Sequence, residues 1–132
     1  MKYKFPRGFW WGSASSATQM EGAYDEGGKE LNIWDYWYEN EPQKFYSNVG
    51  PYNTSNFYHK YESDIKLMKE LGHNSFRFSI SWSRLIKKDN SVNEEAVKFY
   101  NNVIDTMLEN NVEPFINLFH FDMPMYLQEI GG

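Results

Sequence analysis

Cysteine is absent from this chain of 132 residues, which excludes a disulfide framework and thiolate metal sites. No stretch approaches the run of about 18 apolar residues that a membrane-spanning helix needs. Basic residues are also few, with 13 Lys and Arg against 18 Asp and Glu and a net charge of −5. A nucleic-acid-binding surface would be basic instead. We therefore expect a partner that is neither a membrane nor a nucleic acid.

The N-terminus starts like a secretory leader but does not continue as one. Residues 2–4 carry positive charge, and then Pro6 and Arg7 stand where an apolar segment would follow. Together with the lack of cysteine, this predicts a cytoplasmic protein.

Aromatic residues are plentiful, with 5 Trp, 10 Tyr and 10 Phe making up 19% of the chain. Aromatic side chains build hydrophobic cores, and they also stack on the apolar faces of sugar rings. For any single aromatic residue the core role is favoured. Their density near the N-terminus keeps sugar binding open as a second interpretation.

Residues 113–124 form the most informative stretch. Pro114 opens an apolar run, and His120, Asp122 and Pro124 follow it. A continuous apolar run predicts a strand buried on both faces, as in parallel sheets. Polar residues after such a strand occupy the edge where α/β enzymes hold their ligands. From this stretch alone, His120 is equally well explained as a core histidine bonded to a backbone carbonyl.

The N-terminal part alternates between short regular segments and loops. Residues 9–13 predict a strand whose small residues allow close approach by other groups. Residues 18–22 predict a loop carrying Gln19 and Glu21, and residues 24–52 a long loop with one helical turn at 32–37.

Two helices and a strand follow. Thr54 or Ser55 is expected to cap the first helix, which ends at Gly72. Its apolar stripe comprises Phe57, Tyr61, Ile65, Met68 and Leu71. We expect its two histidines, His59 and His73, to be solvated or to cap its end.

Residues 76–83 alternate apolar and polar, which predicts a strand with Arg77 on its polar face. If the sheet closes into a barrel, that face lies inside, and a buried arginine then needs carboxylate partners. Asn93 is expected to cap the second helix, and Asn110 and Asn111 to end it. The expected apolar face of this helix comprises Val97, Tyr100, Ile104, Met107 and Leu108. A short helix is expected at 125–129, and the strand–helix order predicts a parallel sheet.

Four blocks of this sequence, at residues 5–23, 32–35, 61–84 and 120–124, resemble the retaining β-glycosidases of glycoside hydrolase family 1. That family includes β-glucosidases and 6-phospho-β-glucosidases and folds as a (β/α)8 TIM barrel. The resemblance implies an α/β fold in which residues 1–132 form the N-terminal portion, strands 1–3, of an incomplete barrel domain. A typical barrel needs roughly 250 residues. We expect the encoded protein to continue past Gly132 or to be a truncated copy.

The resemblance also implies roles for individual residues. Gln19 and His120 match positions that hydrogen-bond the hydroxyls of the glycone sugar, and Arg77 matches the arginine that orients the nucleophile. Phe121 stands where many members have Trp, so it keeps an apolar wall and loses an N–H donor. The substrate implied is a β-glycoside or a phosphorylated disaccharide, with no metal and no cofactor.

Catalysis in this family uses two carboxyl groups about 5–5.5 Å apart. They belong to an Asn-Glu-Pro motif after strand four and a Glu-Asn-Gly motif after strand seven, so no catalytic residue is expected here. Residues 40–42 spell the first motif, but they lie in the long loop and are interpreted as coincidence. The family gives neither Glu21 nor Asp122 the catalytic role.

The chain alone is therefore expected to be inactive as a hydrolase. The alternative is a non-catalytic sugar-binding or interaction module derived from the same fold. A third interpretation, a self-contained βαβ domain, is disfavoured by the polar face that carries Arg77. Unpaired edges on strands one and three predict that the chain self-associates or remains poorly packed.

Overall fold

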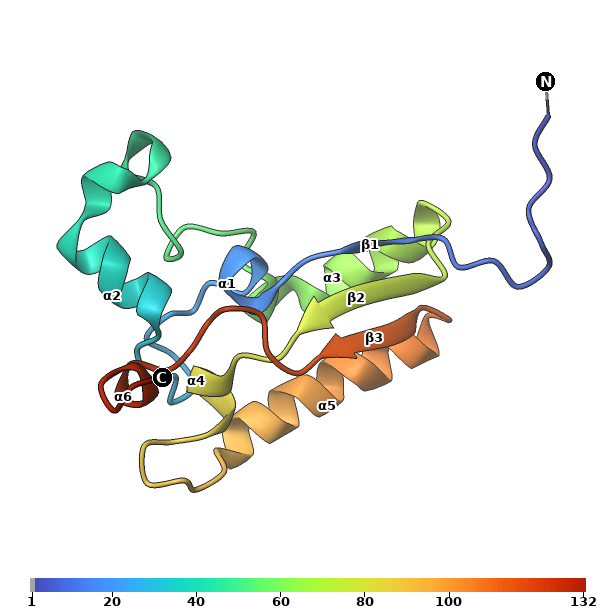
Figure 1. Ribbon diagram of the computed structural model, residues 1–132. Coiled ribbons are helices and arrows are strands. Elements are labelled where there is room, and N and C mark those ends of the chain that lie inside the picture. The colour runs from blue at the N-terminus through green and yellow to red at the C-terminus, as the bar shows by residue number, and fades with distance from the viewer. Residues whose placement is uncertain (1) are drawn as a thin grey trace.

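The computed structural model describes residues 2–132, which form a three-stranded parallel sheet with helices on one face (Figure 1). The strands are β1 (Gly12–Ala14), β2 (Ser75–Ser79) and β3 (Glu113–Asn117), in the order β1-β2-β3. The helices are α1 (Ala17–Met20), α2 (Ile33–Asn40), α3 (Phe57–Glu70), α4 (Trp82–Leu85), α5 (Glu94–Glu109) and α6 (Met125–Gln128), with the 3-10 turns η1 (Pro42–Lys44) and η2 (Tyr46–Asn48). The predicted parallel sheet and the expected short helix near the C-terminus are confirmed.

The core lies between β2 and the helices α3 and α5. Phe76 and Phe78 are buried there, as the alternating pattern predicts, together with Phe57, Ile65, Ala96, Phe99, Tyr100, Val103 and Met107. The carboxyl ends of the strands point toward α1 and α4, and the N-terminal tail extends from the opposite end of the sheet (Figure 1). Within residues 2–132 no helix is both long and apolar enough to cross a bilayer.

The first predicted strand is shorter and begins later than expected, at Gly12 instead of Phe9. The N–H of Trp11 bonds the Asn74 side chain at 2.6 Å and not a backbone carbonyl. The rings of Phe5, Phe9 and Trp11 pack on one another before the strand begins. Close approach at Gly12 is confirmed, because a Cβ there would clash with the Ser75 carbonyl.

One segment predicted as a loop is helical, and one predicted helical turn is longer than expected. Residues 17–20 form α1 within the expected loop, and the turn predicted at 32–37 extends to the eight residues of α2. The side chain of Asn32 caps α2 by accepting bonds from the N–H groups of Trp34 and Asp35 at 2.9 and 3.0 Å. This capping box stabilises a helix that apolar periodicity alone does not indicate.

The predicted cap of α3 is wrong. Asn56, in the left-handed conformation, precedes the helix, while the hydroxyls of Thr54 and Ser55 both donate to the Met20 carbonyl at 3.1 and 3.2 Å. Leu71 also departs from the expected stripe, since 70% of it is exposed.

The end of α3 follows the prediction at Gly72, which has φ +87°. The N–H of His73 reaches back to the Met68 carbonyl at 2.9 Å, which completes a Schellman motif. His59 is exposed as expected and pairs with Glu26. His73 is partly buried, and its ring Nδ1 has no hydrogen-bond partner among the described residues. Of the two predicted roles it takes the one at the helix end, through its backbone N–H.

The strand predicted at 76–83 ends early, at Ser79, because its last residues turn into α4. The N–H of Ser81 donates to the Tyr100 hydroxyl at 2.8 Å, which takes the chain out of the sheet. Trp82 therefore belongs to a helical turn, and its indole N–H donates to the Leu118 carbonyl at 2.7 Å.

For α5, the Asn93 cap and the left-handed Asn111 are confirmed. The buried face is partly different: Ala96, Phe99 and Val103 join Tyr100 and Met107, whereas Leu108 is 51% exposed. Both faces of this helix carry apolar residues, and the position of α3 and β2 decides which face is covered.

The prediction that the third strand is buried on both faces is wrong for this chain. Phe115 and Ile116 in β3 are 42% and 40% exposed. In the described residues β3 pairs only with β2, so it forms an edge of the sheet.

Candidate functional site

Three of the four predicted site residues line one hollow at the carboxyl end of the sheet. This first hollow, of about 240 Å³, is bordered by Ser16, Thr18, Gln19, Trp34, His120 and Phe121. Gln19 lies on α1, directly after β1, and the two residues at 120 and 121 follow β3. Because the sheet is parallel, segments distant in sequence meet at this edge.

Gln19 is held at the rim of the first hollow. The Ser16 hydroxyl donates to its Oε1 at 2.7 Å, and its –NH2 group makes no hydrogen bond within residues 2–132. The Ser79 hydroxyl accepts a bond from the Ala17 N–H at 2.8 Å, which fixes α1 to β2. The arrangement leaves amide N–H donors for a ligand hydroxyl.

His120 is oriented by Asn117, whose amide lies 3.1 Å from the ring Nδ1. With Nδ1 accepting, the neutral ring carries its proton on Nε2 and presents it as a donor. The alternative of a core histidine bonded to a backbone carbonyl is not what the structure shows.

Phe121 adopts φ +62°, a conformation that a bulky side chain rarely takes, and the side chain is 68% exposed. The Trp34 indole N–H donates to the Phe121 carbonyl at 3.1 Å. Two backbone bonds of 2.9 Å, from Ile33 to Met123 and from Met125 to Leu31, join the same two segments. The start of α2 therefore holds residues 120–124 in place.

Arg77, the fourth predicted residue, does not line the first hollow. It lies on the face of β2 opposite Phe76 and Phe78, as the alternation predicts, and is partly buried. Its Nη1 is 3.5 Å from the Ser15 carbonyl, and it makes no ion pair within the described part of the chain.

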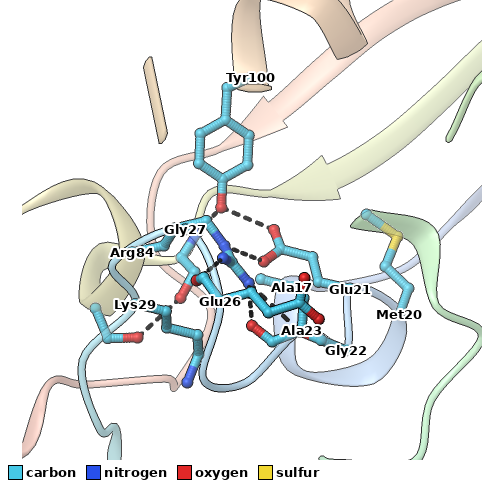
Figure 2. A network of polar contacts seen from close by, with 12 residues as sticks. Ala17, Met20, Glu21, Gly22, Ala23, Glu26, Gly27, Lys29, Arg84 and Tyr100 are labelled. Carbon is cyan, nitrogen blue, oxygen red and sulfur yellow. Dashed lines mark hydrogen bonds and ion pairs between the residues drawn. The ribbon is translucent and has the colours of Figure 1, made fainter. Parts of the chain in front are cut away.

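A buried ionic network beneath the site was not predicted (Figure 2). Arg84 is fully buried, with its Nε 3.0 Å from Oε2 of Glu21. The Tyr100 hydroxyl donates to the other carboxylate oxygen at 2.7 Å. The remaining N–H groups of Arg84 donate to the carbonyls of Gly22, Ala23 and Glu26, at 2.9–3.3 Å. The Arg84 side chain thus provides hydrogen-bond donors for three backbone carbonyls in the turn that follows Gln19.

Burial raises the pKa of Glu21, and the nearby Arg84 guanidinium and Tyr100 hydroxyl offset part of that rise. Burial also raises the pKa of Tyr100, and the Glu21 carboxylate raises it further. The only sequence signal for Arg84 is its place at the end of the 61–84 block, because a single buried arginine leaves no periodic pattern.

Asp35 and Lys29 form a second buried ion pair, which sequence reasoning also missed. Asp35 accepts a bond from the Asn32 N–H at 3.1 Å and so completes the cap of α2. This pair fixes the turn from which Trp34 projects.

Asp122 is buried, and its Oδ1 accepts a bond from the His120 N–H at 3.4 Å. Burial raises its pKa, while the N–H bonds and Lys29 lower it in part. Its Oδ2 has no hydrogen-bond partner in the described structure. Neither Asp122 nor Glu21 lines the first hollow.

Among residues 2–132 there is no cluster of three or more metal-ligating side chains.

The chain is similar to known glycosidases along almost its whole length. It is 64% identical, over 99% of its residues, to 6-phospho-beta-glucosidase GmuD of Bacillus subtilis (strain 168), of which it covers 28%. The psychrophilic beta-glucosidase BglU of Micrococcus antarcticus superposes with a TM-score of 0.93 at 39% identity, over 98% of this chain and 28% of that one. A GH1 beta-glucosidase of the fungus Humicola insolens, solved in complex with glucose, gives a TM-score of 0.86 at 37% identity over 94% and 26%.

These relatives are TIM-barrel enzymes, and the chain spans less than a third of each. The predicted fold class is therefore confirmed: the sheet β1-β2-β3 with its helices is the N-terminal portion, strands 1–3, of a TIM barrel. The family model for glycosyl hydrolase family 1 matches residues 1–132, and the chain belongs to that family.

Proposed function

We propose that this chain supplies the glycone-binding part of a retaining glycosidase that hydrolyses β-glucosides or 6-phospho-β-glucosides. The supporting observation is that Gln19, His120 and Phe121 border one hollow. Gln19 and His120 would donate hydrogen bonds to sugar hydroxyls, and the exposed ring of Phe121 would form an apolar wall. Arg77 would orient the nucleophilic carboxylate, from a position outside the hollow.

The catalytic carboxylates of this proposal lie outside residues 1–132. No carboxylate borders the first hollow, and glycoside hydrolysis with retention needs two of them flanking the bond. The chain is thus an incomplete barrel domain and is expected to leave nitrophenyl β-glucoside and its 6-phosphate uncleaved. Cleavage of either compound by the purified chain would contradict this part of the proposal. A cytoplasmic location stays a prediction.

Titration of the chain with glucose and glucose 6-phosphate, followed by NMR, tests the glycone site. We expect saturable shifts that include the Trp34 indole N–H, and their loss in Gln19→Ala. Gln43→Ala is the matched control, because Gln43 is exposed in η1 and lies outside the hollow. Equal binding by both variants would count against Gln19 as a sugar contact.

The second candidate is a sugar-binding module without catalysis. It is favoured by a site that gathers donors and an aromatic wall but no carboxylate. Saturable binding by a natural chain ending at Gly132 would support it. Hydrolysis by a longer natural form of the chain would support the enzyme instead.

A further inference from the structure

A second and much smaller cavity borders α1 and the turn that leads into α2. Its volume is about 10 Å³, and Thr18, Glu21, Lys29 and Asp35 are among the side chains that line it. Thr18 belongs to α1 and Asp35 to α2, while Lys29 lies in the turn between the two helices. A cavity of about this size has room for a single water molecule.

Three of these side chains have hydrogen-bonding capacity that no described protein group uses. The Thr18 Oγ1 atom is buried and has no hydrogen-bond partner in the described part of the chain. The Lys29 ammonium group, which is 7% exposed, has three N–H bonds, of which two point to Oδ2 of Asp35 and to the Glu30 carbonyl. The described bonds to Asp35, from Lys29 and from the Asn32 N–H, both end at Oδ2. A hydroxyl, an N–H donor and the carboxylate atom Oδ1 therefore remain at the cavity.

These three groups match the bonds that one water molecule makes. Burying a polar group without a partner costs free energy, so such groups are normally paired with protein or with ordered water. Buried water molecules typically make about three hydrogen bonds to such groups. A water in this cavity would accept a bond from Lys29, donate one to Oδ1 of Asp35 and share one with the Thr18 hydroxyl.

The charges around the cavity favour a neutral occupant. Both carboxylates that line it are already paired with a buried cation, Asp35 with Lys29 and Glu21 with Arg84. The cavity therefore has no net charge that would attract an ion. A cation would also meet the Lys29 ammonium group, and an anion would meet the two carboxylates.

We propose that this cavity is a binding site for one buried water molecule, which joins Thr18 of α1 to Lys29 and Asp35 at the start of α2. Gln19 follows Thr18, Trp34 precedes Asp35, and both of these neighbours line the first hollow. The water thus links the two segments that form opposite parts of that wall. The inference does not depend on the proposed function, because no sugar takes part in it.

The test is oxygen-17 magnetic relaxation dispersion of the 132-residue chain, which counts water molecules that stay bound for longer than the protein takes to tumble. We expect Thr18→Val to hold one long-lived water fewer than the wild type, because valine has the shape of threonine without its hydroxyl. Thr18→Ser keeps the hydroxyl and should keep the water. Thr106→Val is the matched control: the Thr106 hydroxyl donates to the Asn102 carbonyl at 2.7 Å and does not line the cavity, so the count should not change.

The outcomes decide the proposal whether or not every variant folds, which far-UV circular dichroism checks. A wild type with no long-lived water would overturn it, and so would equal counts in the wild type and in folded Thr18→Val. If Thr18→Val does not fold, cross-relaxation between water and the amide protons of the lining residues gives the answer. We expect it in the wild type and in Thr18→Ser, with the sign of a long-lived water, and its absence from both would overturn the proposal.

Discussion

Arg84 and Glu21 form an ion pair in which neither side chain is more than 3% exposed. The two residues lie 63 positions apart in the sequence, Glu21 directly after α1 and Arg84 in α4. Arg84 also makes hydrogen bonds to three carbonyls of the turn after Glu21, so the position of Gln19 depends on a residue that never contacts the first hollow.

Replacing this arginine tests its structural role. Arg84→Met removes the partner of a buried carboxylate and is expected to lower the free energy of unfolding by about 3–5 kcal/mol. Urea denaturation followed by circular dichroism measures the change. Lys44→Met is the control: it breaks an exposed pair of 3.9 Å with Glu41 and should change stability by less than about 0.5 kcal/mol. An equal decrease in the free energy of unfolding in both variants would contradict the structural role of Arg84.

The buried carboxyl of Asp122 predicts a pH dependence. Its pKa in the folded chain lies above the ordinary value of 3.8, because burial disfavours the charged form. Because the folded pKa is raised, the stability that Asp122 contributes is fully present below pH 3.8 and is lost as the pH rises through the folded pKa. Compared with the non-titrating Asp122→Asn, the wild type should therefore lose stability between acid and neutral pH.

Asp89→Asn provides a control of opposite sign. The Ser91 side chain and N–H bond the Asp89 carboxylate and lower its pKa. The stability that Asp89 contributes is therefore present above the pKa of the unfolded chain and is lost on acidification. If both aspartates gave the same direction of pH dependence, the assignment to burial would be wrong.

The contact between β1 and β2 predicts that Gly12 is intolerant of a side chain. A Cβ at Gly12 would clash with the Ser75 carbonyl, so Gly12→Ala must separate the strands. We expect a loss of about 1–3 kcal/mol, typical of overpacking. Thermal denaturation should show a lower midpoint than for Ser13→Ala, a neighbouring exposed position in the same strand.

The free edge of β3 predicts association between chains. Unpaired backbone groups on an edge strand are a template for another strand, and a lysine there discourages pairing. We expect light scattering to show larger species as concentration rises, and Phe115→Lys to reduce them. Tyr46→Lys adds the same charge far from the strand and should leave the size distribution unchanged. A strictly monomeric wild type would contradict this prediction.

Much of the fold could be predicted because its signals are local. The stripe of α3 and the alternation of β2 each depend on neighbours within a few residues, and both gave elements of the right type. The face of α5 was harder, since Leu108 and Val103 fit equally good stripes and only the covering elements decide between them. The Glu21–Arg84 pair is separated by α2, α3 and β2, so no local pattern indicates it.

For the site, the family resemblance found Gln19, His120 and Phe121, which the structure places in one hollow. It did not find Trp34, although residues 32–35 belong to one of the matching blocks. The Trp34 indole N–H donates to the backbone carbonyl of Phe121. A pattern of side chains in the sequence does not reveal a partner that is a backbone group.

The bond from Trp34 to Phe121 joins positions 87 residues apart, which has a consequence for the order of folding. Closing such a long segment costs conformational entropy that the local turns of α3 and α5 do not incur. We expect the helices and the β2 contacts to form first and the Trp34–Phe121 junction near the end. Substitution of Trp34 should then accelerate unfolding while leaving the refolding rate nearly unchanged. The first hollow, proposed above to bind the glycone, is on this view the last region of the chain to become ordered and the first to open.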